Sequence, residues 1–223
     1  MSLAGPGLML CVKAPWPGRC KTRLAEAYGS DVAAEFAVAF MDDLSANVRA
    51  WPGEHVLVCE DVAHPLLARL VGPGGWTHLP LPRAPLGELL GAAFQQCFEA
   101  GLRPVLAVGG DLPDLTAVDL LVAMECLGRR DVVLGPSADG GYYLIGLNGW
   151  LPEAFTGIPW STPETLAVTL ARLRHAGRTV ELLPVRRDID EPGDLQVLLR
   201  DLPRIRLCPR TAEAARKAGV AVL

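Results

Sequence analysis

The sequence has no excess of positive charge, and it has very little lysine. Its formal net charge at pH 7 is −4 and its pI is about 5.6. Nucleic-acid-binding proteins gain affinity from basic residues that release counterions from phosphates, so we expect no nucleic-acid partner. Only three of the 21 basic residues are lysines, and two of them, Lys13 and Lys21, lie in one short segment. In a chain dominated by arginine, this placement indicates a need for a compact point charge, as for a phosphate oxygen.

The sequence also lacks paired cysteines, long apolar segments and a linker. Its six cysteines are scattered, without a C-x-x-C pair or a histidine at metal-ligand spacing, so we expect free thiols. No apolar segment has membrane-spanning length, and Met1–Gly7 has no basic stretch before a hydrophobic core; both features predict a cytoplasmic protein without a membrane span. Because no linker-like stretch divides the chain, we predict one domain over 1–223, with a core at about 8–199 and a C-terminal extension at 200–223, and the 50% of hydrophobic residues can fill a sizeable core.

Short apolar runs alternate with helical patterns along the chain, which predicts alternating strands and helices. The predicted strands are Leu8–Val12, His55–Cys59, Pro104–Val108, Asp131–Leu134, Tyr142–Leu147 and Thr179–Leu183. The predicted helices are Ser30–Val48 with Ser30 as its N-cap, Pro65–Val71, Leu86–Ala100, Thr116–Leu127 with a capping box of Thr116 and Asp119, and Thr162–His175. This order predicts an α/β fold with a mostly parallel sheet covered on both faces, which binds ligands beyond the carboxyl ends of its strands.

The segment Lys13–Arg23 joins the first predicted strand to a helix and carries four cations in eleven residues. Two prolines stiffen it, Gly18 lets the backbone approach a ligand closely, and the following helix start offers free N–H groups to an anion. It has neither the Walker A pattern nor a dinucleotide fingerprint, and a solvated basic loop is the alternative. The predicted nucleotide- and phosphate-binding residues are Lys13, Ala14, Pro15, Gly18, Arg19, Lys21 and Arg23.

Asp111 follows the predicted strand Pro104–Val108 and should lie at the carboxyl end of that strand. Mg²⁺ is usually held by one or two carboxylates together with phosphate oxygens and water, so an acid that faces a basic loop is a candidate metal ligand. The alternative is a turn residue that hydrogen-bonds its own backbone before Pro113. After the last strand, Asp188 or Asp190 could complete the metal site, and either could instead cap a helix.

Two further segments are candidates for a substrate pocket. Asp139, Gly140 and Gly141 could form a hairpin turn, or a loop whose glycines permit close approach to a ligand. Trp160 stands before a predicted helix and could stack on a sugar or base, although core packing is the more frequent role of tryptophan. The predicted pocket residues are Asp139, Gly140, Gly141, Tyr142, Trp160, Ser161 and Thr162.

Five motifs in this order resemble one family. They are K-A-P-x-P-G-x-x-K-T-R-L at Lys13–Leu24, G-D-L-P at Gly110–Pro113, D-G-G-Y-Y-L-I-G-L at Asp139–Leu147, I-P-W-S-T at Ile158–Thr162 and D-I-D at Asp188–Asp190. From about Leu8 to Leu199 the chain is similar to the bacterial glycosyltransferase-like family of the nucleotide-diphospho-sugar transferase superfamily, long carried as a domain of unknown function. The resemblance implies a single-domain, Rossmann-like glycosyltransferase-A fold in which the first loop cradles the nucleotide and Asp111 binds Mg²⁺ or Mn²⁺.

More distant relatives bear on the second metal ligand. Molybdenum-cofactor and phospholactate guanylyltransferases and sugar-acid cytidylyltransferases carry a late x-[DN]-T-P-E-D-L segment that is similar to Asp190–Leu195. This resemblance implies Asp190, rather than Asp188, as the second ligand.

The chain departs from the family pattern at three positions. Pro85 and Leu89 stand where an acid and an arginine are usual, and Gly110 stands where serine or threonine is usual. These departures bear on substrate choice and on activity.

The predicted function is metal-dependent transfer from a nucleotide-activated donor to a small-molecule acceptor, with Asp111 and Lys21 as the candidate catalytic residues. The family resemblance favours glycosyl transfer from a nucleoside-diphosphate sugar. The charge of the first loop and the absence of Asp-x-Asp at Asp111 favour the alternative, nucleotidyl transfer from a nucleoside triphosphate to a phosphorylated acceptor. A non-catalytic nucleotide-binding protein is a third hypothesis, motivated by the departures at Pro85 and Leu89. No nucleophile triad is recognisable, so we expect direct displacement.

Overall fold

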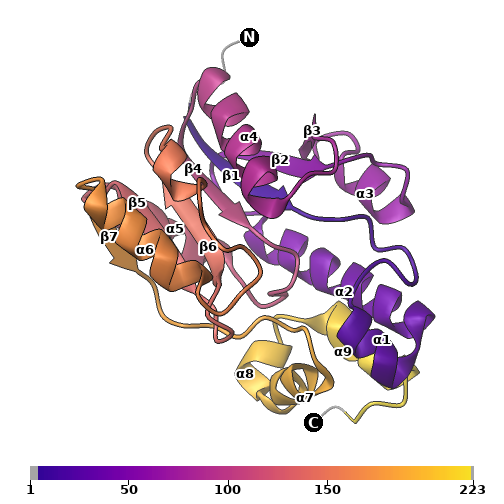
Figure 1. The fold of residues 1–223 in the computed structure, drawn as a ribbon. Helices are drawn as coiled ribbons and strands as arrows, with labels where there is room; N and C mark the ends of the chain where they lie inside the picture. Colours follow the sequence, from indigo (N-terminus) through magenta and orange to yellow (C-terminus); the bar gives the residue numbers. More distant parts are fainter. Residues whose placement is uncertain (1–4, 222–223) are drawn as a thin grey trace.

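The computed structural model describes residues 5–221, and this part of the chain contains one seven-stranded sheet. The strands are β1 (Gly5–Cys11), β2 (Glu54–Cys59), β3 (Thr77–Pro80), β4 (Leu102–Val108), β5 (Val132–Pro136), β6 (Tyr142–Leu147) and β7 (Val180–Leu182). Their order is β3-β2-β1-β4-β6-β5-β7 (Figure 1). All neighbouring pairs are parallel except the two that β6 makes with β4 and β5. The predicted mostly parallel α/β fold is therefore confirmed.

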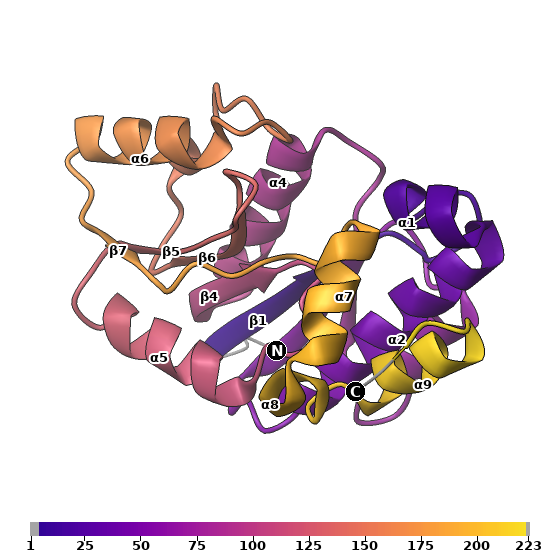
Figure 2. The same ribbon diagram turned by 90° about the horizontal axis from the view of Figure 1, so that it is seen from below.

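Helices cover both faces of the sheet (Figure 2). On one face pack α2 (Ser30–Val48), α3 (Pro65–Leu70) and α5 (Ala117–Leu127); on the other pack α4 (Leu86–Glu99), α6 (Thr165–His175) and the short 3-10 helix η1 (Pro152–Ala154). The central strand β1 shows why its sequence is continuously apolar. Successive side chains of a strand point to opposite faces, so Leu8 and Leu10 enter one core and Met9 enters the other. A strand buried on both sides has no position for a polar residue.

The end of the chain packs against its beginning. The elements that meet there are α1 (Thr22–Tyr28), α7 (Pro192–Arg200), α8 (Leu202–Ile205) and α9 (Pro209–Lys217) (Figure 1). They share a core with Phe36 and Phe40 of α2. The buried Asp43 of α2 accepts hydrogen bonds from the backbone N–H groups of Arg210 and Thr211 at 3.0 and 2.8 Å. This carboxylate therefore caps α9 from a neighbouring helix.

Most predicted elements agree with the structure within a few residues, and the capping box of Thr116 and Asp119 is confirmed. The strand β3, the short helices α1 and η1 and the C-terminal helices α8 and α9 have no counterpart in the prediction. The prediction that α6 begins at Thr162 is wrong, because the Thr165 hydroxyl donates to the carbonyls of Thr162 and Pro159 and closes a turn before the helix. The predicted N-cap Ser30 is the first residue of α2, and Gly29 is the N-cap.

All six cysteines are free thiols, as predicted. Among residues 5–221, no helix combines the length and the apolarity needed to cross a membrane. Residues 1–4 of the N-terminal segment and residues 222–223 of the C-terminal extension lie outside the described range. The division of the chain into one domain with a C-terminal extension stays a prediction.

Candidate active site

The predicted site segments meet at one edge of the sheet. The strands β1, β4, β5 and β7 run in the same direction, so their carboxyl ends share this edge, and the antiparallel β6 begins there. The basic segment after β1, Asp111 after β4, the hairpin turn between β5 and β6, and the segment after β7 are therefore neighbours. A parallel sheet brings together residues that are distant in sequence in this way.

Lys21 contacts both aspartates that the sequence predicts as metal ligands. Its Nζ lies 2.6 Å from Asp111 Oδ1 and 2.7 Å from Asp190 Oδ1, and it donates a hydrogen bond to the carbonyl of Ile189 at 2.6 Å. The Lys21 side chain is 6% exposed, whereas those of Asp111 and Asp190 are 46% and 42% exposed. Burial lowers the pKa of Lys21, but the two carboxylates raise it by more, so the pKa lies above its ordinary value. The ammonium is therefore charged at neutral pH.

A backbone hydrogen bond joins the two segments that carry Asp111 and Asp190. The N–H of Ile189 donates to the carbonyl of Asp111 at 3.0 Å, so the segment after β7 runs beside the loop after β4. Lys21 has left-handed backbone angles, φ 45° and ψ 49°, immediately before α1. This conformation costs a non-glycine residue about 1 kcal/mol. The residue that adopts it here is the one whose side chain forms ion pairs with Asp111 and Asp190.

The helix-cap alternative for Asp188 and Asp190 is wrong. The helix α7 begins with a capping box made by Glu191 and Asp194, and the N–H of Asp190 donates to Asp194 at 3.2 Å. The self-capping turn proposed as the alternative for Asp111 has no counterpart among the hydrogen bonds of the described residues, because this carboxylate contacts Lys21 instead. The carboxylates of Asp111 and Asp190 therefore pair with Lys21 rather than with local backbone.

Asp188 adds to the negative charge of this edge. Burial raises the pKa of its carboxyl to about 7, and the nearby charges of Asp111, Asp190 and Asp139 contribute to the rise. Three acids close enough to raise the pKa of a fourth form a region of negative potential, which a cation would relieve.

The donor set fits a divalent cation that shares its ligands with a nucleotide. Within residues 5–221, no group of three or more histidine, cysteine, aspartate or glutamate side chains is arranged to hold a metal. Mg²⁺, however, usually takes one or two carboxylates and completes its shell with water and phosphate oxygens. Asp111 and Asp190 are half exposed and already share one cation, the Lys21 ammonium. Both carboxylates therefore converge on one cation already, as the ligands of a shared metal ion would.

The cations of the first loop divide into two sets. Lys13 and Arg19 are exposed and form no ion pair with any residue of the described range, so their charges are available to an anion. Lys21 is committed to acids, and Arg23 lies 3.4 Å from Glu191 in an exposed pair. Gly18 has φ 72°, which favours glycine. The predicted binding residues Ala14 and Pro15 belong to the same loop, and their contact with a phosphate stays a prediction.

The middle of the same loop lines a groove to which Asp111, Asp188 and Asp190 do not contribute. Pro15, Trp16 and Pro17 line an open groove of about 600 Å³ together with residues of α2, α9 and His64. The ring of Trp16 packs edge-on against His64, with centroids 4.5 Å apart.

The segment of Asp139 is a hairpin turn between β5 and β6. The Asp139 carboxylate accepts hydrogen bonds from the Ser137 hydroxyl and, at 2.9 Å, from the N–H of Gly141. Gly140 has φ 91°, and a Cβ there would meet the backbone of Pro163 at 2.2 Å. The turn interpretation is therefore confirmed, and Gly140 is required for the approach of another protein segment.

Trp160 lies against Tyr142, with ring centroids 5.9 Å apart at 72°. Its indole nitrogen lies so near Gly87, at the start of α4, that a Cβ on this glycine would be 2.1 Å away. The structure thus joins the predicted pocket segments Asp139–Tyr142 and Trp160–Thr162 to each other. Their role in substrate binding stays a prediction.

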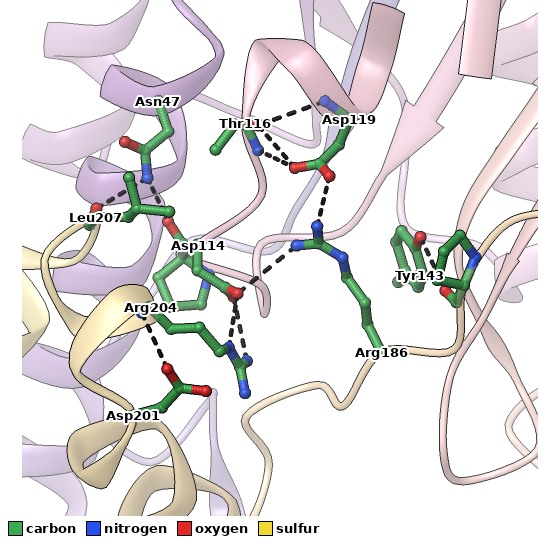
Figure 3. A network of polar contacts seen from close by, with 11 residues as sticks. Asn47, Asp114, Thr116, Asp119, Tyr143, Arg186, Asp201, Arg204 and Leu207 are labelled. Atoms are coloured by element: carbon green, nitrogen blue, oxygen red, sulfur yellow. Dashed lines mark hydrogen bonds and ion pairs between the residues drawn. The ribbon is translucent and has the colours of Figure 1, made fainter. Parts of the chain in front are cut away.

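A network of ion pairs begins in the same loop as Asp111 and was not predicted from the sequence. The Asp114 side chain, only 5% exposed, accepts a hydrogen bond from Arg204 Nε at 2.8 Å and lies 3.6 Å from Arg186 Nη1 (Figure 3). Arg186 also pairs with Asp119 at 2.5 Å. We call these four residues, Asp114, Asp119, Arg186 and Arg204, the arginine network. It holds the loop after β4 against the segment after β7 and the C-terminal helices.

The sequence carries only a weak signal for this network. Asp114 follows the G-D-L-P motif directly, but Arg204 is 90 residues away and Arg186 is 67 residues from Asp119. Asn47 strengthens the same junction, since its Nδ2 donates to the carbonyls of Pro113 and Leu207 at 2.7 and 2.9 Å (Figure 3).

The fold and the comparisons define an enzyme of the transferase class with a nucleotide-diphospho-sugar transferase type of fold. The family described as "Uncharacterized protein conserved in bacteria (DUF2064)" matches residues 43–162. A relative named 3-phospho-D-glycerate guanylyltransferase, from Phenylobacterium zucineum (strain HLK1), is 31% identical over an alignment of 188 residues that covers 78% of this chain and 81% of the relative. The chain belongs to the DUF2064 family, whose model matches more than half of it.

Solved structures agree with this assignment. The crystal structure of a protein provisionally named a nucleotide-diphospho-sugar transferase, from Desulfovibrio desulfuricans G20, has a TM-score of 0.87 at 30% identity and covers 96% of this chain and 95% of its own. CMP:2-keto-3-deoxy-manno-octonic acid synthetase complexed with CTP has a TM-score of 0.55 at 12% identity, over 87% and 96% of the two chains. The second similarity shows the fold alone.

Proposed function

We propose that this transferase is a metal-dependent nucleotidyltransferase, which moves a nucleoside monophosphate from a nucleoside triphosphate to a phosphorylated small molecule. The observation that carries the proposal is the cluster at the sheet edge. Lys21 is held between the half-exposed Asp111 and Asp190, beside a loop whose Lys13 and Arg19 have no acidic partner in the described residues. The half-exposed carboxylates can hold a divalent cation, and the unpaired basic side chains of the loop can contact the phosphates of a nucleotide bound to that cation.

The reaction is a direct displacement at phosphorus. A phosphate oxygen of the acceptor forms a bond to the α-phosphorus, the bond from that phosphorus to the bridging oxygen breaks, and pyrophosphate leaves with the electron pair. A divalent ion held by Asp111 and Asp190 would neutralise charge on the phosphates. Lys13 and Arg19 stabilise the charge that gathers on the leaving pyrophosphate.

Guanylyl transfer is the first version to test, because the 31% identical relative is named a guanylyltransferase for 3-phospho-D-glycerate. Glycosyl transfer, which the family resemblance favours, is the second candidate. It is supported by the provisional name of the similar structure from Desulfovibrio desulfuricans G20.

The test combines binding with product formation. Thermal unfolding is followed with each of four nucleoside triphosphates or with nucleotide sugars, in Mn²⁺ and in EDTA. We expect GTP with Mn²⁺ to stabilise the protein by about 2.7 kcal/mol at a hundredfold excess over Kd. Pyrophosphate release from GTP and 3-phosphoglycerate then measures turnover.

The control variant is Glu125→Gln on the exposed face of α5, which leaves the sheet edge intact and should behave as wild type. Stabilisation by nucleotide sugars alone would replace nucleotidyl transfer by glycosyl transfer. Nucleotide binding that ignores the metal and is unchanged in Asp111→Ala would favour the third hypothesis, a non-catalytic nucleotide-binding protein.

A further inference from the structure

The Lys21 ammonium is fully occupied by oxygens of the protein. Its Nζ donates hydrogen bonds to Asp190 Oδ1 and to the carbonyl of Ile189 and forms an ion pair with Asp111 Oδ1, so three oxygens within 2.7 Å surround its three N–H groups. The side chain is 6% exposed, and its Nζ lies 5.6 Å from the centre of the Phe40 ring. In this state no N–H of Lys21 is left for a phosphate, unlike the exposed Lys13 and Arg19.

The same ammonium occupies the place between the two predicted metal ligands. A divalent ion that bound Asp111 and Asp190 together would contact the oxygens that Lys21 now contacts, and two cations at one point repel each other strongly. The backbone supplies a reason why Lys21 can leave. Its left-handed conformation is unfavourable for lysine, and the contacts with the acids compensate for it. Because the contacts must offset this backbone strain, they hold Lys21 less strongly than they would hold a lysine in a favourable conformation.

We infer that Lys21 is the internal counterion of the metal site: its ammonium holds Asp111 and Asp190 together in the free protein, and a divalent cation must displace it to bind. The inference rests on the proposed function, because it takes these two acids as metal ligands. A displaced ammonium needs new acceptors, and nucleotide phosphates provide them. Metal and nucleotide should therefore bind cooperatively, each raising the affinity of the other by the same factor.

The experiment measures Mn²⁺ binding to the full chain without nucleotide, by electron paramagnetic resonance of the free ion. Lys21→Met keeps the length of the stem and removes the charge. We expect this variant to bind Mn²⁺ at least about tenfold more tightly than wild type, because a competing positive charge is gone. Lys217→Met is the matched control: it removes an exposed lysine of α9 that pairs with Glu213, and its Mn²⁺ affinity should equal that of wild type.

Loss of a buried cation between two acids can weaken folding, so the thermal midpoint gives a second readout. Mn²⁺ should raise the midpoint of Lys21→Met by more than it raises that of wild type. The double variant Lys21→Met/Asp111→Asn has one acid fewer to balance. It should fold without metal and lose the gain in Mn²⁺ affinity.

Equal or weaker Mn²⁺ binding by Lys21→Met, with no larger rise in its midpoint, overturns the inference. The proposed function is judged separately, by the Mn²⁺ affinity of wild type with and without GTP. If GTP raises that affinity while Lys21→Met shows no gain, the inference fails and the proposed function stands. If GTP has no effect on wild type, the proposed function fails whatever Lys21→Met does.

Discussion

Asp111 and Asp114 lie three residues apart in the loop after β4, and their side chains are 46% and 5% exposed. Asp114 belongs to the arginine network, where two guanidinium groups satisfy it. Asp111 shares a single ammonium with Asp190, and its charge, together with those of Asp190 and Asp139, contributes to the raised pKa of Asp188.

The difference between the two acids separates stability from function. Burial makes a charge costly unless it is paired, so the partners of Asp114 contribute to the fold. A half-exposed carboxylate in a region of excess negative charge contributes little to the free energy of unfolding. It leaves an unbalanced charge at the open edge, which a cation from solution can balance.

The largest effect is expected from Asp111→Asn, which tests the functional half of the comparison. Turnover should fall by about 10²–10³-fold, the loss seen when one preorganised electrostatic group is removed. The free energy of unfolding should change by less than about 1 kcal/mol, because the side chain is half exposed. Pyrophosphate release and urea unfolding check the two halves. A variant with normal turnover would remove Asp111 from the site.

Asp114→Asn tests the structural half. The change leaves Arg204 and Arg186 without their shared anion, and breaking a buried pair typically costs about 3 kcal/mol. Urea unfolding at neutral pH measures this loss. Where the variant stays folded at low temperature, its KM for nucleotide should match that of wild type. A loss below about 1 kcal/mol would mean that the arginine network does not stabilise the junction.

Asp43→Ala extends the comparison to a buried acid whose carboxylate accepts hydrogen bonds from backbone N–H groups. This carboxylate is 2% exposed and accepts from two N–H groups and the Thr211 hydroxyl at the start of α9. Loss of a helix cap of this kind costs about 2 kcal/mol. Its neighbour Asp42, which pairs with the exposed Arg69, serves as the control. Asp42→Ala should cost less than about 1 kcal/mol, and similar losses for both variants would contradict the assignment of a cap.

Lys13→Ala gives the smallest expected effect and tests the open side of the site. An exposed side chain without a partner in the described residues contributes little to folding, so the free energy of unfolding should change by less than about 0.5 kcal/mol. The KM for the nucleotide should rise by about three- to tenfold at low salt, and the difference should shrink as salt screens the charge. An unchanged KM at every salt concentration would place Lys13 outside the phosphate site.

Local patterns predicted much of the fold. The apolar run at Tyr142–Leu147 agrees with β6 at both ends, and the capping box at Thr116 marks the start of α5. The order of strands and helices was sufficient for a mostly parallel sheet. The same patterns did not reveal β3, whose four residues are exposed or only partly buried and so lack an apolar signal. They also could not show that the turn around Thr165 delays α6.

For the site, the sequence determined which chemical groups are present and at which strand ends they stand. Only the tertiary structure decided what each group contacts. It assigned Lys21 to Asp111 and Asp190, placed Asp139 in a hairpin turn, and buried Asp114 against Arg204. The physical reason is that strand and helix signals depend on neighbours along the chain. The charge partners of Asp111, Asp114, Asp119 and Asp190 lie instead on segments 67 or more residues away.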